Sequence, residues 1–450
     1  MIAAARRRAV IGWVLFDWAA QPFFTLVTTF IYAPYFVVYL AGDPVRGQTI
    51  WGYTVAAAGL VVALAGPLCG AIADRHGARK YWVAGASVLL VAGCAALWLA
   101  VPGPGHGLWL GIGAFILATA GAELATIFTN AMLPDIAGQG RVGRLSGLGW
   151  AVGYVGGLLA LAAMLALFIA DGDSGRTLAG LKPLFGLDEA RFEGARFSGP
   201  FSALWYIVFV MPLFAFVPGR SRAMKLGAAI GSGASALKAT LGVLVTRRGE
   251  IGRFLVARMF YADGLAALFA FGGAYAAAVF GWQASEVGLF GIVLIIAAAL
   301  GAWAGGHCDD LLGSRRTVLI SIAILIAAVL AILSVDRNHL LFVVETEPAG
   351  RDGLFASWPE RAYLGLGSVI GLVSGPVQSA SRSLLVRLAP AGEMAEYFGL
   401  YAFSGKATVF AGPLLVGAAT ALSGDLRLGF SVIAAFLAVG GVLLWRLPGR

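Results

Sequence analysis

The chain has 450 residues, of which 60% are hydrophobic and only 12% are charged, and its formal net charge is +9. Its mean hydropathy is +0.86, whereas an average soluble domain carries roughly 25% charged residues. A single soluble core stops growing at about 250–300 residues, so this composition excludes a soluble enzyme. The high hydrophobicity also excludes a disordered chain, and an integral membrane protein is indicated.

Twelve apolar runs are long enough to cross a hydrocarbon core of roughly 30 Å as helices, which takes about 20 residues each. We predict an all-α protein, because the runs lack the alternation of barrel strands. The first run is too long for a signal peptide, so an uncleaved first helix is expected. The predicted spans are 10–40, 50–73, 81–101, 108–131, 145–170, 201–218, 251–280, 286–307, 317–335, 361–382, 396–421 and 427–446.

Lysine and arginine are more than twice as numerous on the side of the membrane that holds both termini. The positive-inside rule therefore predicts cytoplasmic termini, in a bacterial inner (plasma) membrane. The positive net charge then reflects topology, and no nucleic-acid partner is expected. We expect a monomer with the lipid bilayer as its surroundings. The function of two acid-rich outer loops, 171–200 and 336–360, is not evident from the sequence.

The spans divide the chain into an N-terminal six-helix bundle (1–218), a cytoplasmic linker (219–250) and a C-terminal six-helix bundle (251–450). The linker is basic and amphipathic, which is typical of a helix lying on an anionic membrane surface. Its basic residues are Arg220, Arg222, Lys225, Lys238, Arg247 and Arg248.

A motif occurs twice, after spans 2 and 8, with an offset of 236 residues (310 minus 74). Both copies read G-x-x-x-D-x-x-G-x-R-[KR], which indicates duplicated halves, a feature of transporters. The motif residues are Gly70, Asp74, Arg75, Gly77, Arg79 and Lys80 in the first copy, and Asp310, Gly313, Arg315 and Arg316 in the second.

The first copy resembles the best-known motif of the major facilitator superfamily, apart from Ala78, and the second copy has Leu311 in place of an arginine. Three further stretches resemble the autophagy-related vacuolar effluxer-like family and its bacterial relatives: Phe16–Ala19, Asn130–Trp150 and Ser379–Gly399. The resemblance implies two six-helix bundles with a central cavity and alternating access, latched by the motif loop. Asp74 is expected to accept from a helix N-terminus or to pair with an arginine such as Arg141 or Arg144.

Six charged residues lie inside predicted spans, where one charge costs about 2.5–3.5 kcal/mol. They are Asp17, Glu123, Arg253, Arg258, Asp263 and Lys406. Arg253 is near a span end and is expected to extend to the interface. Polar residues at helical spacing in span 1 (Asp17, Gln21, Thr25, Thr28, Tyr32) and span 4 (Thr119, Glu123, Thr126, Asn130) predict walls of a hydrated cavity. Tyr32, Tyr35 and Tyr39 are interpreted as an interfacial aromatic belt.

Each intramembrane polar residue has a structural alternative to a functional role. Asp17 and Lys406 can be partners in packed ion pairs, and Gln378 and Tyr401 can link helices. Glu123 lies mid-span, so a proton-carrying role is favoured. The candidate residues for substrate binding or proton coupling are Asp17, Gln21, Glu123, Asn130, Arg258, Tyr261, Asp263, Gln378, Tyr401 and Lys406.

These features predict a secondary transporter for a small polar or zwitterionic solute, such as an amino acid, with protons as a candidate coupling ion. The alternatives are efflux of amphipathic drugs or lipids by the same fold, and a membrane assembly factor or sensor without transport. The sequence has no nucleophile–base pattern and no P-loop, so no enzyme activity is expected. The scattered cysteines and histidines predict no metal, and no cofactor is expected.

Overall fold

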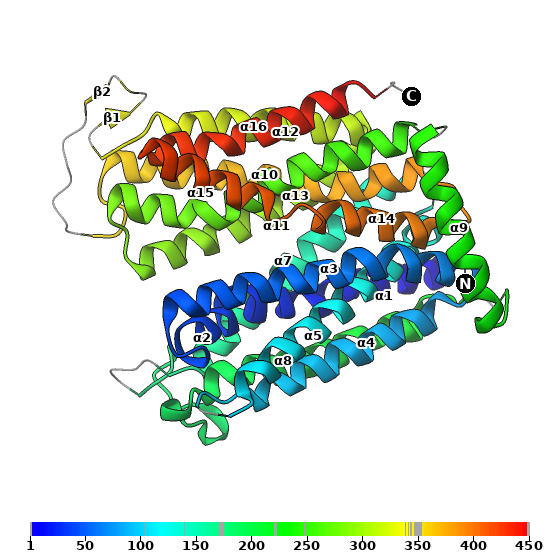
Figure 1. Cartoon of the computed structure of the whole chain (residues 1–450), viewed down its shortest axis with the longest axis horizontal. Coiled ribbons are helices and arrows are strands. Elements are labelled where there is room, and N and C mark those ends of the chain that lie inside the picture. Colours follow the sequence, from blue (N-terminus) through cyan, green and yellow to red (C-terminus); the bar gives the residue numbers. More distant parts are fainter. Residues whose placement is uncertain are drawn as a thin grey trace. The chain divides into compact units, whose positions relative to one another are not determined.

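In a computed structural model, the chain is described at residues 2–103, 105–138, 140–170, 175–219, 223–246, 249–337, 339–340, 342, 344–345 and 353–447. It divides into two compact units (Figure 1). Unit 1 comprises Met1–Gly138, Val152–Ala239 and Pro390–Phe403, and unit 2 comprises Gln139–Ala151, Thr240–Ala389 and Ser404–Arg450. Unit 1 therefore includes a short segment from the C-terminal half of the sequence, and unit 2 includes a short segment from the N-terminal half.

The prediction of an all-α membrane protein is confirmed, because the described residues include 11 helices long and apolar enough to span a membrane. The remaining predicted span, 361–382, is helix α13 (Trp358–Leu388). It has 31 residues, which is ample length, and its apolar sequence is interrupted by serines, Pro376 and Gln378. The two-residue strands β1 (His339–Leu340) and β2 (Val344–Glu345) form an antiparallel pair within a connecting loop.

Unit 1 is built mainly from α1 (Ile2–Pro22), α3 (Pro44–His76), α4 (Arg79–Ala96), α5 (Gly107–Asn130) and α8 (Glu193–Phe216). Helix α5 packs between α3 and α4, while α8 packs on α1 and α4. Close packing of α4 on α5 needs small residues, since a Cβ added at Gly121 would lie 2.2 Å from the backbone nitrogen of Leu90. The short helix α6 (Leu133–Ala137) follows α5.

The first span changes its helical form halfway along. After Pro22 the chain continues as a π-helix (Phe23–Phe30), then as α2 (Tyr32–Tyr35) and a second π-helix (Phe36–Leu40). The backbone N–H of Ile31 accordingly donates to the carbonyl of Leu26, five residues back. A wider turn changes the helical spacing after Pro22. Gln21 and Thr25 still share a face, because a Cβ at Gly157 would meet both side chains.

The prediction of an interfacial aromatic belt is wrong for two of the three tyrosines. Tyr32 and Tyr35 are buried, and the Tyr35 hydroxyl donates to the carbonyl of Ala100 at 2.6 Å. Only Tyr39 is exposed, at 48%.

Helix α8 begins eight residues before the predicted span 201–218, within the predicted outer loop. The reason is Arg196, a buried arginine whose Nε donates to the carbonyl of Trp98 at 2.9 Å. Its guanidinium also lies 4.7 Å from the centre of the Trp98 ring. Arg196 is thus a buried, hydrogen-bonded residue of a packed helix. Hydropathy along the sequence cannot distinguish such an arginine from one in an exposed loop.

Unit 2 contains α10 (Gly249–Phe280), α11 (Ala284–Leu312), α12 (Ser314–Leu333), α13, α15 (Ala411–Ser423) and α16 (Leu426–Trp445). Helix α13 packs on α11 and α12, and α16 packs on α10, α12 and α15. Three helices contribute to both units: α7 (Val142–Leu167), α9 (Leu226–Thr246) and α14 (Met394–Lys406).

The predicted linker contains helix α9 (Leu226–Thr246), most of which belongs to unit 1. Its basic residues Lys225 and Lys238 are exposed. The other four basic residues named for the linker, Arg220, Arg222, Arg247 and Arg248, lie outside the described residues.

Candidate functional site

The first motif copy holds a buried carboxylate against the start of a helix in unit 1. Asp74, whose side chain is 1% exposed, accepts from Arg79 at 2.9 Å and from the backbone N–H of Glu396 at 2.9 Å. Glu396 lies in the first turn of α14, where backbone N–H groups lack helical partners and carry partial positive charge. The arginine that pairs with Asp74 is Arg79 of its own loop, and neither Arg141 nor Arg144 has that role.

The remaining residues of this copy give the loop its shape and close packing. Gly77 has φ of 86°, the left-handed conformation that ends α3. At Gly70 a Cβ would lie 2.1 Å from the carbonyl oxygen of Ala395, so glycine allows the backbones of α3 and α14 to approach. Lys80 donates to the carbonyl of Phe214 at 2.8 Å, and Arg75 is half-buried.

The second copy repeats this arrangement in unit 2. Asp310 accepts from the backbone N–H groups of Gly143 and Arg144, at 2.8 and 3.1 Å, in the first turn of α7. The Arg144 side chain lies 3.6 Å from the same carboxylate, and Arg387 lies 3.4 Å from it. Gly313 has φ of 88° and ends α11. The arginines of the motif differ from the first copy, because Arg315 donates to the carbonyl of Leu444 and Arg316 is exposed.

A second buried arginine joins α7 to α13 within unit 2. Arg382 is 3% exposed, and its guanidinium donates to the hydroxyl of Ser146 at 2.8 Å and to the Ser146 carbonyl at 2.6 Å. The Ser146 hydroxyl in turn donates to the carbonyl of Ser379 at 2.7 Å. The sequence alone does not identify Ser146 as the partner of Arg382, because the two residues are 236 positions apart.

The predicted span 396–421 is interrupted in the structure. Helix α14 ends at Lys406 and α15 begins at Ala411, which leaves a short non-helical segment, 407–410. Broken spanning helices expose backbone groups that commonly bind ions or substrates. Arg258 of α10 lies beside this break, since its guanidinium donates to the Ser404 hydroxyl at 2.8 Å and a Cβ at Gly405 would lie 2.6 Å from it.

Other candidate residues of unit 2 lie around the same helices. Asp263 is 2% exposed, and its Oδ1 has no hydrogen-bond partner within the described part of the chain. The backbone oxygen of Asp263 lies close to Gly412, near the start of α15. Tyr261 shares a hydrogen bond of 2.7 Å with the Ser381 hydroxyl of α13. Gln378 and Lys406 are half-buried.

The candidate residues of unit 1 lie on α1, α5 and α14. Asp17 and Gln21 are half-buried on α1, next to a glycine-rich face of α7, where a Cβ at Gly157 would lie 2.8 Å from the Gln21 side chain. On α5, Glu123 is half-buried and Asn130 is buried at 7% exposure. The half-buried Tyr401 of α14 packs edge-on against Phe398, with ring centres 6.0 Å apart.

Solved structures with the same fold are membrane transporters. The human organic anion transporter MFSD10 aligns with a TM-score of 0.69 and 15% identity, over 98% of this chain and 99% of that chain. The transporter FucP, in an outward conformation, aligns with a TM-score of 0.66 and 14% identity, over 99% of both chains. At these identities the likeness shows the fold alone, which is that of the major facilitator superfamily.

Sequence relatives agree with this fold. An uncharacterized MFS-type transporter of Bacillus subtilis, YxiO, is 23% identical over 442 residues, covering 97% of this chain and 94% of that protein. Autophagy-related protein 22-1 of Neosartorya fischeri is 26% identical over 302 residues, covering 65% of this chain and 46% of that protein. The aligned part therefore spans about half the length of this fungal relative.

A match to one protein family extends over nearly the whole chain, from residue 33 to residue 450. Together with the fold, it makes this protein an integral membrane transporter of the MFS type and not an enzyme. The chain belongs to the family described as vacuole effluxer Atg22-like.

Proposed function

We propose that this transporter moves a small zwitterionic solute, such as an amino acid, across the bacterial inner membrane in exchange or symport with protons. It acts as a monomer with both termini in the cytoplasm and needs no nucleic-acid partner. The description of its family as an effluxer supports outward movement. A zwitterion needs one cationic and one anionic group in the protein, each kept from bulk water.

The observation that carries the proposal is the position of Arg258 beside the break between α14 and α15. Its guanidinium is half-buried and fixed by Ser404. A guanidinium presents several N–H donors in a plane, and this geometry matches the two oxygens of a carboxylate. The N-terminus of α15 follows the break and adds positive partial charge. The carboxylate of the substrate therefore binds at Arg258.

An acid is then required for the amino group, and the predicted candidates are Glu123 and Asp17. Glu123 lies in the middle of α5 and is half-buried, and Asp17 is half-buried on α1. Glu123 is also the predicted proton carrier, because an ionisable residue in the middle of a spanning helix is costly and usually functional. Asp263, with an unpartnered carboxylate oxygen within the described chain, is the second candidate for that role.

Transport of radiolabelled amino acids into proteoliposomes tests the proposal, with and without a pH gradient. Arg258→Gln removes the proposed carboxylate donor, and Arg253→Gln is the matched control, since Arg253 lies on the same helix but is exposed. Loss of a charge-assisted hydrogen bond of about 1.5–3 kcal/mol lowers apparent affinity by roughly tenfold or more. We expect this loss for Arg258→Gln and less than twofold change for Arg253→Gln.

Proton coupling is tested separately with Glu123→Gln and Asp263→Asn. The proposal expects one of these variants to transport at a rate that no longer responds to the pH gradient. If both keep the wild-type response, coupling to protons is wrong while the solute class stands. If no amino acid is transported and the two arginine variants behave alike, the zwitterion hypothesis itself is wrong.

A further inference from the structure

A lateral groove of about 830 Å³ lies in unit 1, and none of the candidate substrate residues is among its lining residues. Helices α3, α4 and α5 form its walls, and the segment 223–226 at the start of α9 forms one end. Most of its lining is apolar, including Trp82, Ala86, Leu89, Leu124 and Phe128. This volume is at the upper end of the roughly 300–1,000 Å³ typical of small-molecule sites.

The groove is open on the outer face of α4. Leu89 is 36% exposed and Tyr81 is 64% exposed. A Cβ at Gly85, between them, would meet no atom within 4 Å, so there is open space above this residue. In a spanning helix such a surface faces lipid, and a ligand can enter sideways from the membrane.

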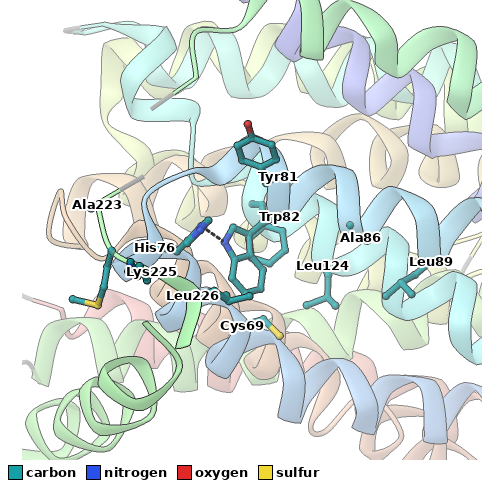
Figure 2. A pocket seen from close by; sticks show the side chains of 13 residues that line it. Cys69, His76, Tyr81, Trp82, Ala86, Leu89, Leu124, Ala223, Lys225 and Leu226 are labelled. Atoms are coloured by element: carbon teal, nitrogen blue, oxygen red, sulfur yellow. Dashed lines mark hydrogen bonds between the residues drawn. The ribbon is translucent and has the colours of Figure 1, made fainter. Parts of the chain in front are cut away.

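One end of the groove is polar and is held by specific contacts (Figure 2). The Nε1–H of Trp82 donates to Nδ1 of His76 at 3.2 Å, so a neutral His76 carries its proton on Nε2 and can donate a hydrogen bond. The backbone N–H of Ala223 donates to the His76 carbonyl at 2.9 Å, which fixes the segment that carries Lys225. Lys225 and His76 both line the groove (Figure 2).

We infer that this groove binds an anionic phospholipid of the leaflet on the side of the α3–α4 loop. The phosphate lies against Lys225 and His76, and an acyl chain extends along Trp82 towards Leu89. Charge complementarity supports this occupant, because the groove has a cation and an N–H donor at one end only. Basic pockets at the ends of spanning helices commonly bind anionic lipid head groups.

A polar solute does not fit the same surface. Its uncharged length along α4 and α5 offers few hydrogen-bonding side chains, and burying polar groups there without partners is unfavourable. A phospholipid matches both parts of the groove, because its phosphate fits the polar end and its acyl chain fits the apolar length. It would also link the start of α9 to α3 and α4. The inference is independent of the transported solute.

Native mass spectrometry of the full-length protein in an uncharged detergent tests this inference. The probes are phosphatidylglycerol, phosphatidylcholine as a zwitterionic lipid with the same chains, and glycerol phosphate as a head group without chains. We expect phosphatidylglycerol to be retained in preference to phosphatidylcholine, and glycerol phosphate not to compete. Lys225→Gln should weaken retention roughly fivefold, the effect of one basic residue near a membrane surface. The matched control Lys238→Gln removes an exposed charge from α9, the helix that follows Lys225, and should have no effect.

A second variant tests the apolar part of the groove. Gly85→Leu places a side chain in the open space without a clash and should abolish retention of phosphatidylglycerol. Equal retention of the two lipids, equal effects of the two lysine variants, or undiminished retention by Gly85→Leu would overturn the inference.

Cysteine modification gives a readout that does not depend on a groove-filling variant. Cys69 lines the groove, Cys94 is buried and Cys308 is exposed. On a Cys308→Ser background, phosphatidylglycerol should slow the reaction of Cys69 with a maleimide several-fold, and phosphatidylcholine should not. An unchanged rate with phosphatidylglycerol would also refute lipid binding here.

Discussion

Replacing Gly70 with alanine introduces a methyl group where α3 lies against α14. The new Cβ would be 2.1 Å from the Ala395 carbonyl oxygen and 2.9 Å from the Cα of Glu396. Both are backbone atoms, so no side-chain rotation relieves the overlap. Ordinary contact begins at 3.4 Å, and the two backbones must therefore separate by about 1.3 Å, the difference between 3.4 and 2.1 Å.

That separation breaks the contact between Asp74 and the start of α14. The hydrogen bond from the Glu396 N–H to Asp74 is 2.9 Å long, and an increase of this size takes it beyond hydrogen-bonding distance. Hydrogen bonds to charged groups contribute about 1.5–3 kcal/mol, so a loss of about 2 kcal/mol is expected. This corresponds to a change of roughly thirtyfold in the local opening equilibrium.

Amide hydrogen exchange on the purified transporter measures this change. In Gly70→Ala, the first turn of α14, including Glu396, should exchange roughly thirtyfold faster than in the wild type. Gly85→Ala is the control, because it makes the same chemical change at a glycine with open space above it. If Glu396 keeps its wild-type protection in Gly70→Ala, the carboxylate–amide contact does not hold α14, and our account of the motif is wrong.

Three further predictions follow from buried polar contacts. Arg382→Met leaves the Ser146 carbonyl without its guanidinium donor and should lower the unfolding free energy by about 3 kcal/mol, seen as a lower thermal midpoint, whereas Arg382→Lys should recover part of it. Asp310→Asn should speed amide exchange in the first turn of α7 and leave α14 unchanged, since the two motif copies act on different helices. Tyr35→Phe removes the hydroxyl that donates to Ala100 and should cost about 1 kcal/mol of stability without changing transport; a large loss of transport would contradict its purely structural assignment.

The overall architecture could be predicted from sequence because membrane spans and repeats leave strong patterns. Apolar runs must be about 20 residues long in any bilayer, and the motif keeps its spacing in both copies. The hydrogen-bond and ion-pair partners of individual residues were harder to predict. The sequence predicted that Asp74 accepts from a helix N-terminus or pairs with an arginine, but it could not show that Arg79 is that arginine.

Local departures from the α-helix were not evident from the sequence. The π-helical turns after Pro22 insert no unusual residue types, so the spacing from Asp17 onwards suggested one continuous face. The break after Lys406 has a clearer cause. Pro413 in the first turn of α15 has no N–H to donate to a preceding turn, which favours starting a helix here over continuing one. The structure accordingly has a non-helical segment, 407–410, before this proline.

Comparison of the two motif copies indicates which of their contacts the motif preserves. Asp74 and Asp310 each accept backbone N–H bonds from the first turn of another helix. Each follows, by four residues, a glycine whose Cβ would collide with that helix's backbone, Gly70 and Gly306 respectively. The arginine contacts are not shared, since Arg315 donates to the end of α16 instead of to the motif carboxylate. The glycine and the aspartate therefore have the same role in both copies: the glycine lets the two helices approach, and the aspartate accepts hydrogen bonds from the first turn of the second helix. The arginines can change partners as long as the buried charge keeps one.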